Sequence, residues 1–151
     1  MAEAGSGSAF SLEVRRRFAA RRERVYRAWT EAEALKRWYA PVDAEVALAE
    51  VELRVGGRWR VHMLGADGQE HRVSGEYREI TPPRRLVFTW HWEHQPEDHV
   101  MVVTVEFNEA GSETELVLRH EGFRNEEERN GHEQGWHGLF AKLAEQVEQT
   151  G

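Results

Sequence analysis

The sequence predicts an α+β fold in which a strongly curved antiparallel sheet of about seven strands wraps around a long C-terminal helix. Three observations support this prediction. An alternating segment is followed by two short stretches of helical period, a series of alternating segments separated by turn residues comes next, and a long apolar stripe of helical period ends the chain. The order is therefore one strand, two helices, six strands and one helix (β-α-α-β6-α). Because sheets twist, the last helix would bury its stripe on the concave face.

The N-terminal part alternates between apolar and polar residues over 10–18, which predicts a half-buried strand. A helical period begins at Arg22. Thr30, followed three residues later by Glu33, matches a capping box and predicts the start of a second short helix. Pro41 cannot continue that helix and ends it.

After Pro41 the chain has the pattern of an antiparallel meander. Its first strand is expected over 46–55, with a phase slip at Ala49-Glu50 that indicates a β-bulge. A three-residue turn over 66–68 with a left-handed Gly68 would pair Val61 with Val73 and keep both apolar sets on one side.

The last strands are expected over 86–92, 101–107 and 116–120, with Pro82-Pro83 ending the strand before them. Residues 108–112 form the final turn, and Gly122 breaks the last strand. Asn125 followed by Glu128 is a second capping box, and it opens the long helix. The apolar stripe of this helix consists of His132, Trp136, Leu139, Phe140, Leu143 and Val147.

Composition indicates one domain over 10–150, preceded by a Gly- and Ser-rich tail over 1–9 that is expected to be disordered. The 151 residues carry a net charge of −7 and no cysteine, and apolar runs are too short for a membrane span or a secretory signal. We therefore expect a cytoplasmic protein that does not bind nucleic acid. Arginines at 15–27 are interleaved with glutamates and are interpreted as a solvated face.

Motifs of catalysis and metal binding are weak. His91, His94 and His99 lie near Glu93, Glu97 and Asp98, but this cluster is interpreted as incidental surface histidine, and no metal or cofactor is expected. The sequence lacks Gly-x-Ser-x-Gly and a phosphate-binding loop. No catalytic residue is assigned, and a role without catalysis is favoured.

Several segments together resemble the START-like (SRPBCC) helix-grip superfamily, and within it the branch of homologues of the activator of heat-shock-protein-90 ATPase. They are Phe18–Thr30, Leu35–Pro41, Gly56–Trp59, His120–Phe123 and Gly135-Trp136. The resemblance implies a helix-grip fold with a hydrophobic cavity between the sheet and the C-terminal helix. Lipid carriers, cyclases and co-chaperone domains share this scaffold, so the resemblance implies no single activity.

The candidate ligand-binding residues are those expected to face this cavity, many of them large and aromatic. His120 and His132 lie on apolar faces, where they are either hydrogen-bonded core residues or polar anchors for a ligand. Gly75, Gly131, Gly135 and Gly138 suggest space between the aromatic walls, although close packing of the helix on the sheet explains the helical glycines equally well. The full set is Trp38, Trp59, Val61, Met63, Val73, Tyr77, Phe88, Trp90, Val103, Leu118, His120, His132, Gly135, Trp136 and Phe140.

The function that follows is binding of a small hydrophobic or amphipathic molecule, lipid-like or aromatic, in the cavity. Two alternatives remain open. One is a protein-interaction module resembling chaperone-ATPase activators, with a chaperone or another protein as its partner. The other is a cyclase-like enzyme that uses His120, His132 and Tyr77 in the same cavity.

Overall fold

A computed structural model of the chain describes residues 10–41 and 43–148, so the predicted tail over 1–9 lies outside the described residues. The order of elements is the predicted one. The elements are β1 (Phe10–Phe18), α1 (Arg22–Thr30), α2 (Ala32–Trp38), β2 (Ala44–Val51), β3 (Arg58–Gly65), β4 (Glu70–Thr81), β5 (Arg85–Trp92), β6 (Met101–Ala110), β7 (Glu113–Phe123) and α3 (Glu126–Val147).

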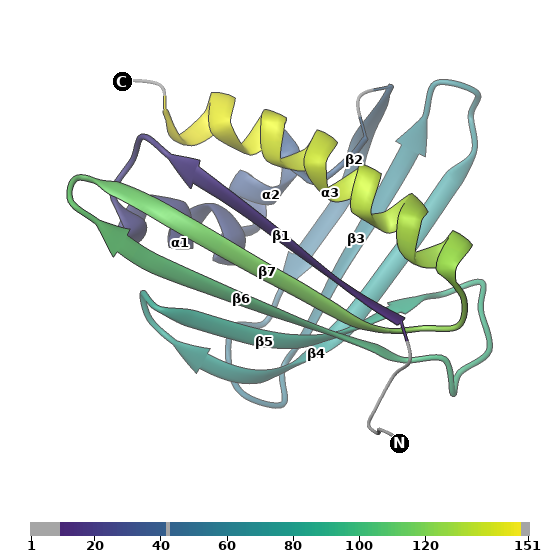
Figure 1. Cartoon of the computed structure of the whole chain (residues 1–151). Coiled ribbons are helices and arrows are strands. Elements are labelled where there is room, and N and C mark those ends of the chain that lie inside the picture. The colour runs from purple at the N-terminus through teal and green to yellow at the C-terminus, as the bar shows by residue number, and fades with distance from the viewer. Residues whose placement is uncertain (1–9, 42, 149–151) are drawn as a thin grey trace, which may run out of the picture.

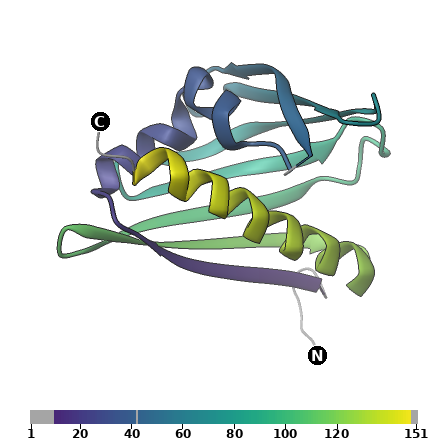
Figure 2. The same cartoon turned by 90° about the horizontal axis from the view of Figure 1, so that it is seen from above.

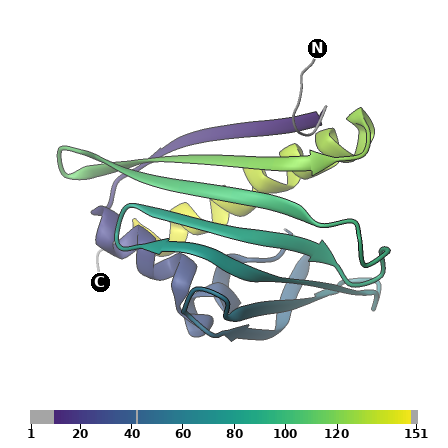
Figure 3. The same ribbon diagram turned by 90° about the horizontal axis from the view of Figure 1, so that it is seen from below.

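The seven strands form one antiparallel sheet in the order β1-β7-β6-β5-β4-β3-β2, and this sheet curves around α3 (Figure 1). Seen from above, α1 and α2 lie beside the C-terminal half of α3 (Figure 2). Seen from below, the strands lie in front of the helices, so all three helices occupy the same side of the sheet (Figure 3). This confirms the predicted architecture of a curved sheet that wraps a long helix.

The core lies between the sheet and the helices and is rich in aromatic side chains. Alternate residues of the strands point inward, and α3 buries Trp136, Leu139, Phe140, Leu143 and Val147 against them. Part of the sheet register was predictable. Val61 pairs with Val73 across the β3–β4 hairpin, and Gly68 in its turn has a φ of 85°, as expected.

The β2 prediction was wrong in length and in the position of the irregularity. The strand ends at Val51, and the register shifts between Val46 and Leu48 instead of at Ala49-Glu50. Leu53 and Val55 continue the alternation but lie beyond the strand, with 44% and 63% of their surface exposed. Alternation alone cannot show where pairing with the neighbouring strand stops.

The capping box at Thr30 was also wrong. Thr30 is the last residue of α1, and its hydroxyl donates to the carbonyl of Tyr26 inside that helix. Glu31 is the N-cap of α2 and forms no side-chain capping bond. The two helices are joined by the single extended residue Glu31, so Glu31 and not Thr30 occupies the N-cap position of α2.

The end of β7 differs from the prediction as well. Gly122 does not break the strand, which continues to Phe123, because Gly122 with its φ of 105° lies at a register shift opposite β1. The predicted final turn over 108–112 is shorter, since β6 continues to Ala110. Asn125 is the N-cap of α3, as expected, and its side chain accepts from the Glu128 N–H.

Candidate functional site

A pocket of about 370 Å³ opens beside the N-terminal half of α3, which we name the α3 pocket. Its floor comes from the ends of β3 and β5, one side from α3, and one edge from the segment after α2. Gly131 and Gly135 are exposed at its mouth. The lining residues are Pro41, Met63, Trp90, Trp92, Glu127, Glu128, Gly131, His132, Gly135, Trp136 and Leu139.

Five of the predicted ligand-binding residues line the α3 pocket, namely Met63, Trp90, His132, Gly135 and Trp136. The others do not line it and lie in the packed core or around a second, much smaller void. These are Trp38, Trp59, Val61, Val73, Tyr77, Phe88, Val103, Leu118, His120 and Phe140.

The second void measures about 10 Å³, which is at the lower limit for one water molecule. It lies among aromatic rings, and two of the residues around it, Trp29 and Tyr39, come from α1 and from the end of α2. The Trp29 ring stacks on Trp136 with ring centres 5.8 Å apart. The middle of the concave face is therefore filled by aromatic rings, and the open space lies at one end.

The two histidines on apolar faces each accept a hydrogen bond from a tryptophan. His120 is fully buried, and its Nδ1 accepts from Trp136 Nε1 at 3.1 Å. His132 Nε2 accepts from Trp92 Nε1 at 2.9 Å, while its Nδ1 donates to the Glu128 carbonyl at 2.9 Å. An indole nitrogen only donates and a carbonyl only accepts, so both imidazoles are neutral in this arrangement.

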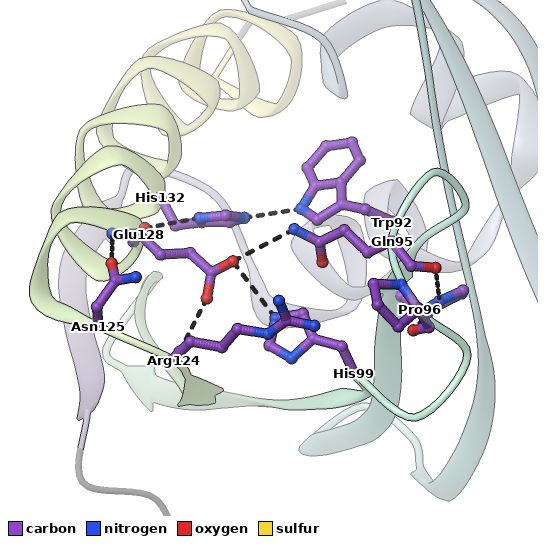
Figure 4. A network of polar contacts seen from close by, with 9 residues as sticks. Trp92, Gln95, Pro96, His99, Arg124, Asn125, Glu128 and His132 are labelled. Atoms are coloured by element: carbon purple, nitrogen blue, oxygen red, sulfur yellow. Dashed lines mark hydrogen bonds and ion pairs between the residues drawn. The ribbon is translucent and has the colours of Figure 1, made fainter.

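Glu128 joins the loop between β5 and β6 to the first turn of α3 (Figure 4). One of its carboxylate oxygens accepts from the Arg124 N–H at 2.9 Å, so Arg124 takes the place that a full capping box would give to Asn125. The other oxygen accepts from Gln95 at 3.4 Å and from His99 at 3.3 Å. His99 was expected on the surface, but it is buried against this carboxylate.

Six lining residues were not in the predicted ligand-binding set, although Gly131 had been named among the glycines that suggest space. They are Pro41, Trp92, Glu127, Glu128, Gly131 and Leu139. The helical spacing held a usable signal for three of them. Glu127 and Gly131 precede Gly135 at intervals of four, as Glu128 and His132 precede Trp136, so each set lies on one face of α3. Glu128 had been assigned only to helix capping.

Burial sets the ionisation of this network. It lowers the pKa of His120 well below its usual range, and the neighbouring His132 adds to this effect. Burial also lowers the pKa of His132. For Glu128 burial acts to raise the pKa, but hydrogen bonds from Arg124, Gln95 and His99 hold it below its ordinary value.

These shifts predict acid sensitivity. Because the unfolded chain binds protons near the ordinary histidine pKa of about 6.5 and the folded chain does not, the stability is fully present above that pH. This contribution to stability is lost progressively as the pH falls below about 6.5. His120→Gln removes one buried imidazole while offering Trp136 another acceptor. We expect the slope of unfolding free energy against pH to flatten by up to about 1.4 kcal/mol per pH unit.

Urea unfolding between pH 7.5 and 5.5 measures this slope in both proteins. Equal slopes for the wild type and His120→Gln would show that His120 does not cause the acid sensitivity.

Of the three residues in the cyclase-like alternative, His132 lines the α3 pocket, and His120 and Tyr77 do not. His132 has both ring nitrogens in hydrogen bonds. Over residues 10–41 and 43–148, no three His, Cys, Asp or Glu side chains are grouped to hold a metal ion. Within the same ranges, no helix is both long and apolar enough to span a membrane. The geometry provides an apolar pocket with two glutamates among the residues that line one end.

Comparison with known proteins places this geometry in a family. Residues 19–148 match the family described as Activator of Hsp90 ATPase homolog 1-like protein. The human activator of 90 kDa heat shock protein ATPase homolog 1 is 32% identical over 120 residues, which cover 78% of this chain and 31% of the human protein. This chain therefore corresponds to about a third of that relative.

Solved structures agree with the fold. A protein from Chromobacterium violaceum has a TM-score of 0.87 at 28% identity, covering 93% of this chain and 98% of its own. An Hsp90 activator from Plasmodium falciparum has a TM-score of 0.72 at 26% identity, covering 88% and 92%. With the helix-grip architecture and the match over 19–148 in agreement, the chain belongs to the family of Activator of Hsp90 ATPase homolog 1-like proteins.

Proposed function

We propose that the protein binds a small apolar or amphipathic molecule in the α3 pocket. The single observation that carries this proposal is a largely apolar pocket of about 370 Å³ lined by three tryptophans. Pockets for small molecules have volumes of about 300 to 1,000 Å³ and combine apolar walls with a few polar groups. The exposed Gly131 and Gly135 leave the mouth without side chains, which gives a ligand access.

A neutral apolar dye tests this function. N-phenyl-1-naphthylamine fluoresces more strongly in apolar surroundings, so its titration into the folded protein should give a saturable rise at one site per chain. Its binding should also change tryptophan emission, because Trp90, Trp92 and Trp136 line the pocket. A response that rises linearly without saturation, and that leaves the tryptophan emission unchanged, would contradict the proposal.

Regulation of a chaperone ATPase is a second candidate, and the 32% identity to the human activator supports it. A second observation is a charged groove of about 570 Å³ on the outer face of the sheet. Its lining includes Arg58 and Arg78, which have no ion-pair partner among the described side chains. Such groups are available to acidic residues of another protein.

ATP hydrolysis by an Hsp90-type chaperone, measured with and without this chain, tests the second candidate. Stimulation of ATP hydrolysis that is lost in Arg58→Glu/Arg78→Glu and kept in Gly135→Leu, which fills the α3 pocket, would support the chaperone candidate. An unchanged rate at saturating chain concentration would contradict it.

A further inference from the structure

The face of α3 that lines the pocket changes in residue type along the helix, from acidic to apolar. Two neighbouring rows of α3 residues line the pocket, each with a spacing of four. The first row is Glu127, Gly131 and Gly135, and the second is Glu128, His132 and Trp136. Both rows begin with a carboxylate in the first helical turn. The lining therefore includes two glutamates at the end where α3 begins and becomes fully apolar toward Leu139.

The acidic end adjoins a corner of three inclined indole rings. The Trp90 and Trp92 ring centres lie 5.6 Å apart at 82°, and those of Trp90 and Trp136 lie 5.3 Å apart at 56°. The hydrogen bonds from Trp92 to His132 and from Trp136 to His120 fix two of these rings. At these spacings the three rings pack on one another, and the half-buried Trp92 is the most exposed of them. Indole faces attract cations, so Trp92 offers a surface for an ammonium group.

The charged residues of the lining also favour a cationic ligand. Glu127 and Glu128 line the pocket and no Lys or Arg does, while the half-buried His132 accepts from an indole and donates to a carbonyl, as a neutral imidazole does. The N-terminal dipole of α3 is equivalent to about half a positive charge, which is less than the two carboxylates carry. Lys142 donates to the carbonyls of Ala40 and Pro41. It lies about 22 Å along the helix from Glu127, at a rise of about 1.5 Å per residue.

We propose that the α3 pocket selects a cationic amphiphile, an aryl- or alkylammonium ion. Its apolar body packs against Met63, Trp136 and Leu139, and its ammonium group lies between the Trp92 ring and the carboxylate of Glu127. Both carboxylate oxygens of Glu128 already accept hydrogen bonds. This inference rests on the proposed binding function and names the class of ligand. Glu127 is exposed and has no hydrogen-bond or ion-pair partner among the described residues, so its carboxylate is available.

Three probes of one shape and different charge test the selectivity by isothermal titration calorimetry at pH 7.5. They are 1-naphthylmethylamine as the cation, 1-naphthylmethanol as the neutral molecule and 1-naphthoate as the anion. We expect the cation to bind roughly three- to tenfold more tightly than the alcohol, and the anion more weakly than either. The advantage of the cation should shrink as salt is added.

Glu127→Gln should weaken the binding of the amine about threefold and leave the alcohol unchanged. Glu126→Gln is the matched control, because it removes the same charge from the same helical turn at a residue that does not line the pocket. Equal affinities for the amine and the alcohol, or equal effects of the two substitutions, would overturn the cation proposal while leaving the binding function in place. Failure of all three probes to bind would contradict both.

Discussion

Replacing Gly75 with alanine should strongly destabilise the protein. A Cβ at this position would lie 1.8 Å from the Thr89 carbonyl oxygen and 2.5 Å from Trp59 Nε1. These two atoms are joined by a hydrogen bond of 3.1 Å, so the Trp59 indole crosses the backbone at Gly75 to reach β5. Neither neighbour can move without breaking that bond or a sheet contact. We expect a loss of more than about 3 kcal/mol.

Urea unfolding followed by circular dichroism measures the effect. Gly138→Ala is the matched control, because its added Cβ has no neighbour within 4 Å and lies in a helix. The control should gain about 0.5 to 1 kcal/mol of stability, the usual difference between glycine and alanine in a helix. A loss of less than about 1 kcal/mol in Gly75→Ala would show that the sheet adapts around position 75.

A comparison of Gly75 with Gly135 shows that the sequence alone could not distinguish a closely packed glycine from one beside open space. Gly75 and Gly135 had both suggested space between aromatic walls. In the structure the backbone at Gly75 lies against the Trp59 ring, whereas no atom lies within 4 Å of a Cβ built at Gly135. In the sequence both glycines precede an inward-facing aromatic residue, Tyr77 two positions after Gly75 and Trp136 directly after Gly135. What distinguishes the two positions is the Trp59 side chain of β3, which lies against Gly75 and has no counterpart at Gly135.

Regular periodicity explains the part of the fold that was predictable. Strand alternation and the three-residue turn at Gly68 placed Val61 opposite Val73, because a shift of one residue would reverse the faces of a strand. The residues at which helices and strands begin and end were less predictable. Thr30 could have capped α2, but α1 includes it.

The candidate site was predicted as a set of inward-facing residues, and that description could not locate the open end. Trp38 faces inward as expected, but it is fully buried and donates to the carbonyl of Ala28. Aromatic rings from α1 and from the end of α2 fill the central region. These helices lie beside the C-terminal half of α3 (Figure 2), whereas most of the α3 residues that line the pocket come from its N-terminal half. Glu127 and Glu128 were missed because acidic residues in a first helical turn also have an ordinary role in helix stability.

Substitution of Gly135 with leucine should strongly weaken ligand binding in a protein that folds normally. Gly135 lines the α3 pocket, and an added side chain would extend from an open position into the space proposed for the ligand. The same change removes a helical glycine, so stability should stay constant or rise by up to about 1 kcal/mol. We expect at least a tenfold weaker affinity for N-phenyl-1-naphthylamine, which corresponds to about 1.4 kcal/mol.

Gly138→Leu provides the control for this experiment, since it adds the same side chain to the same helix at an open position outside the pocket lining. It should match Gly135→Leu in thermal stability and the wild type in dye affinity. Wild-type affinity in Gly135→Leu would place the binding site elsewhere. If Gly135→Leu instead lost about 1 to 3 kcal/mol of stability and Gly138→Leu did not, α3 would have to pack closely on the sheet at Gly135. The glycine would then serve helix packing, and the proposed pocket would not be open at that position.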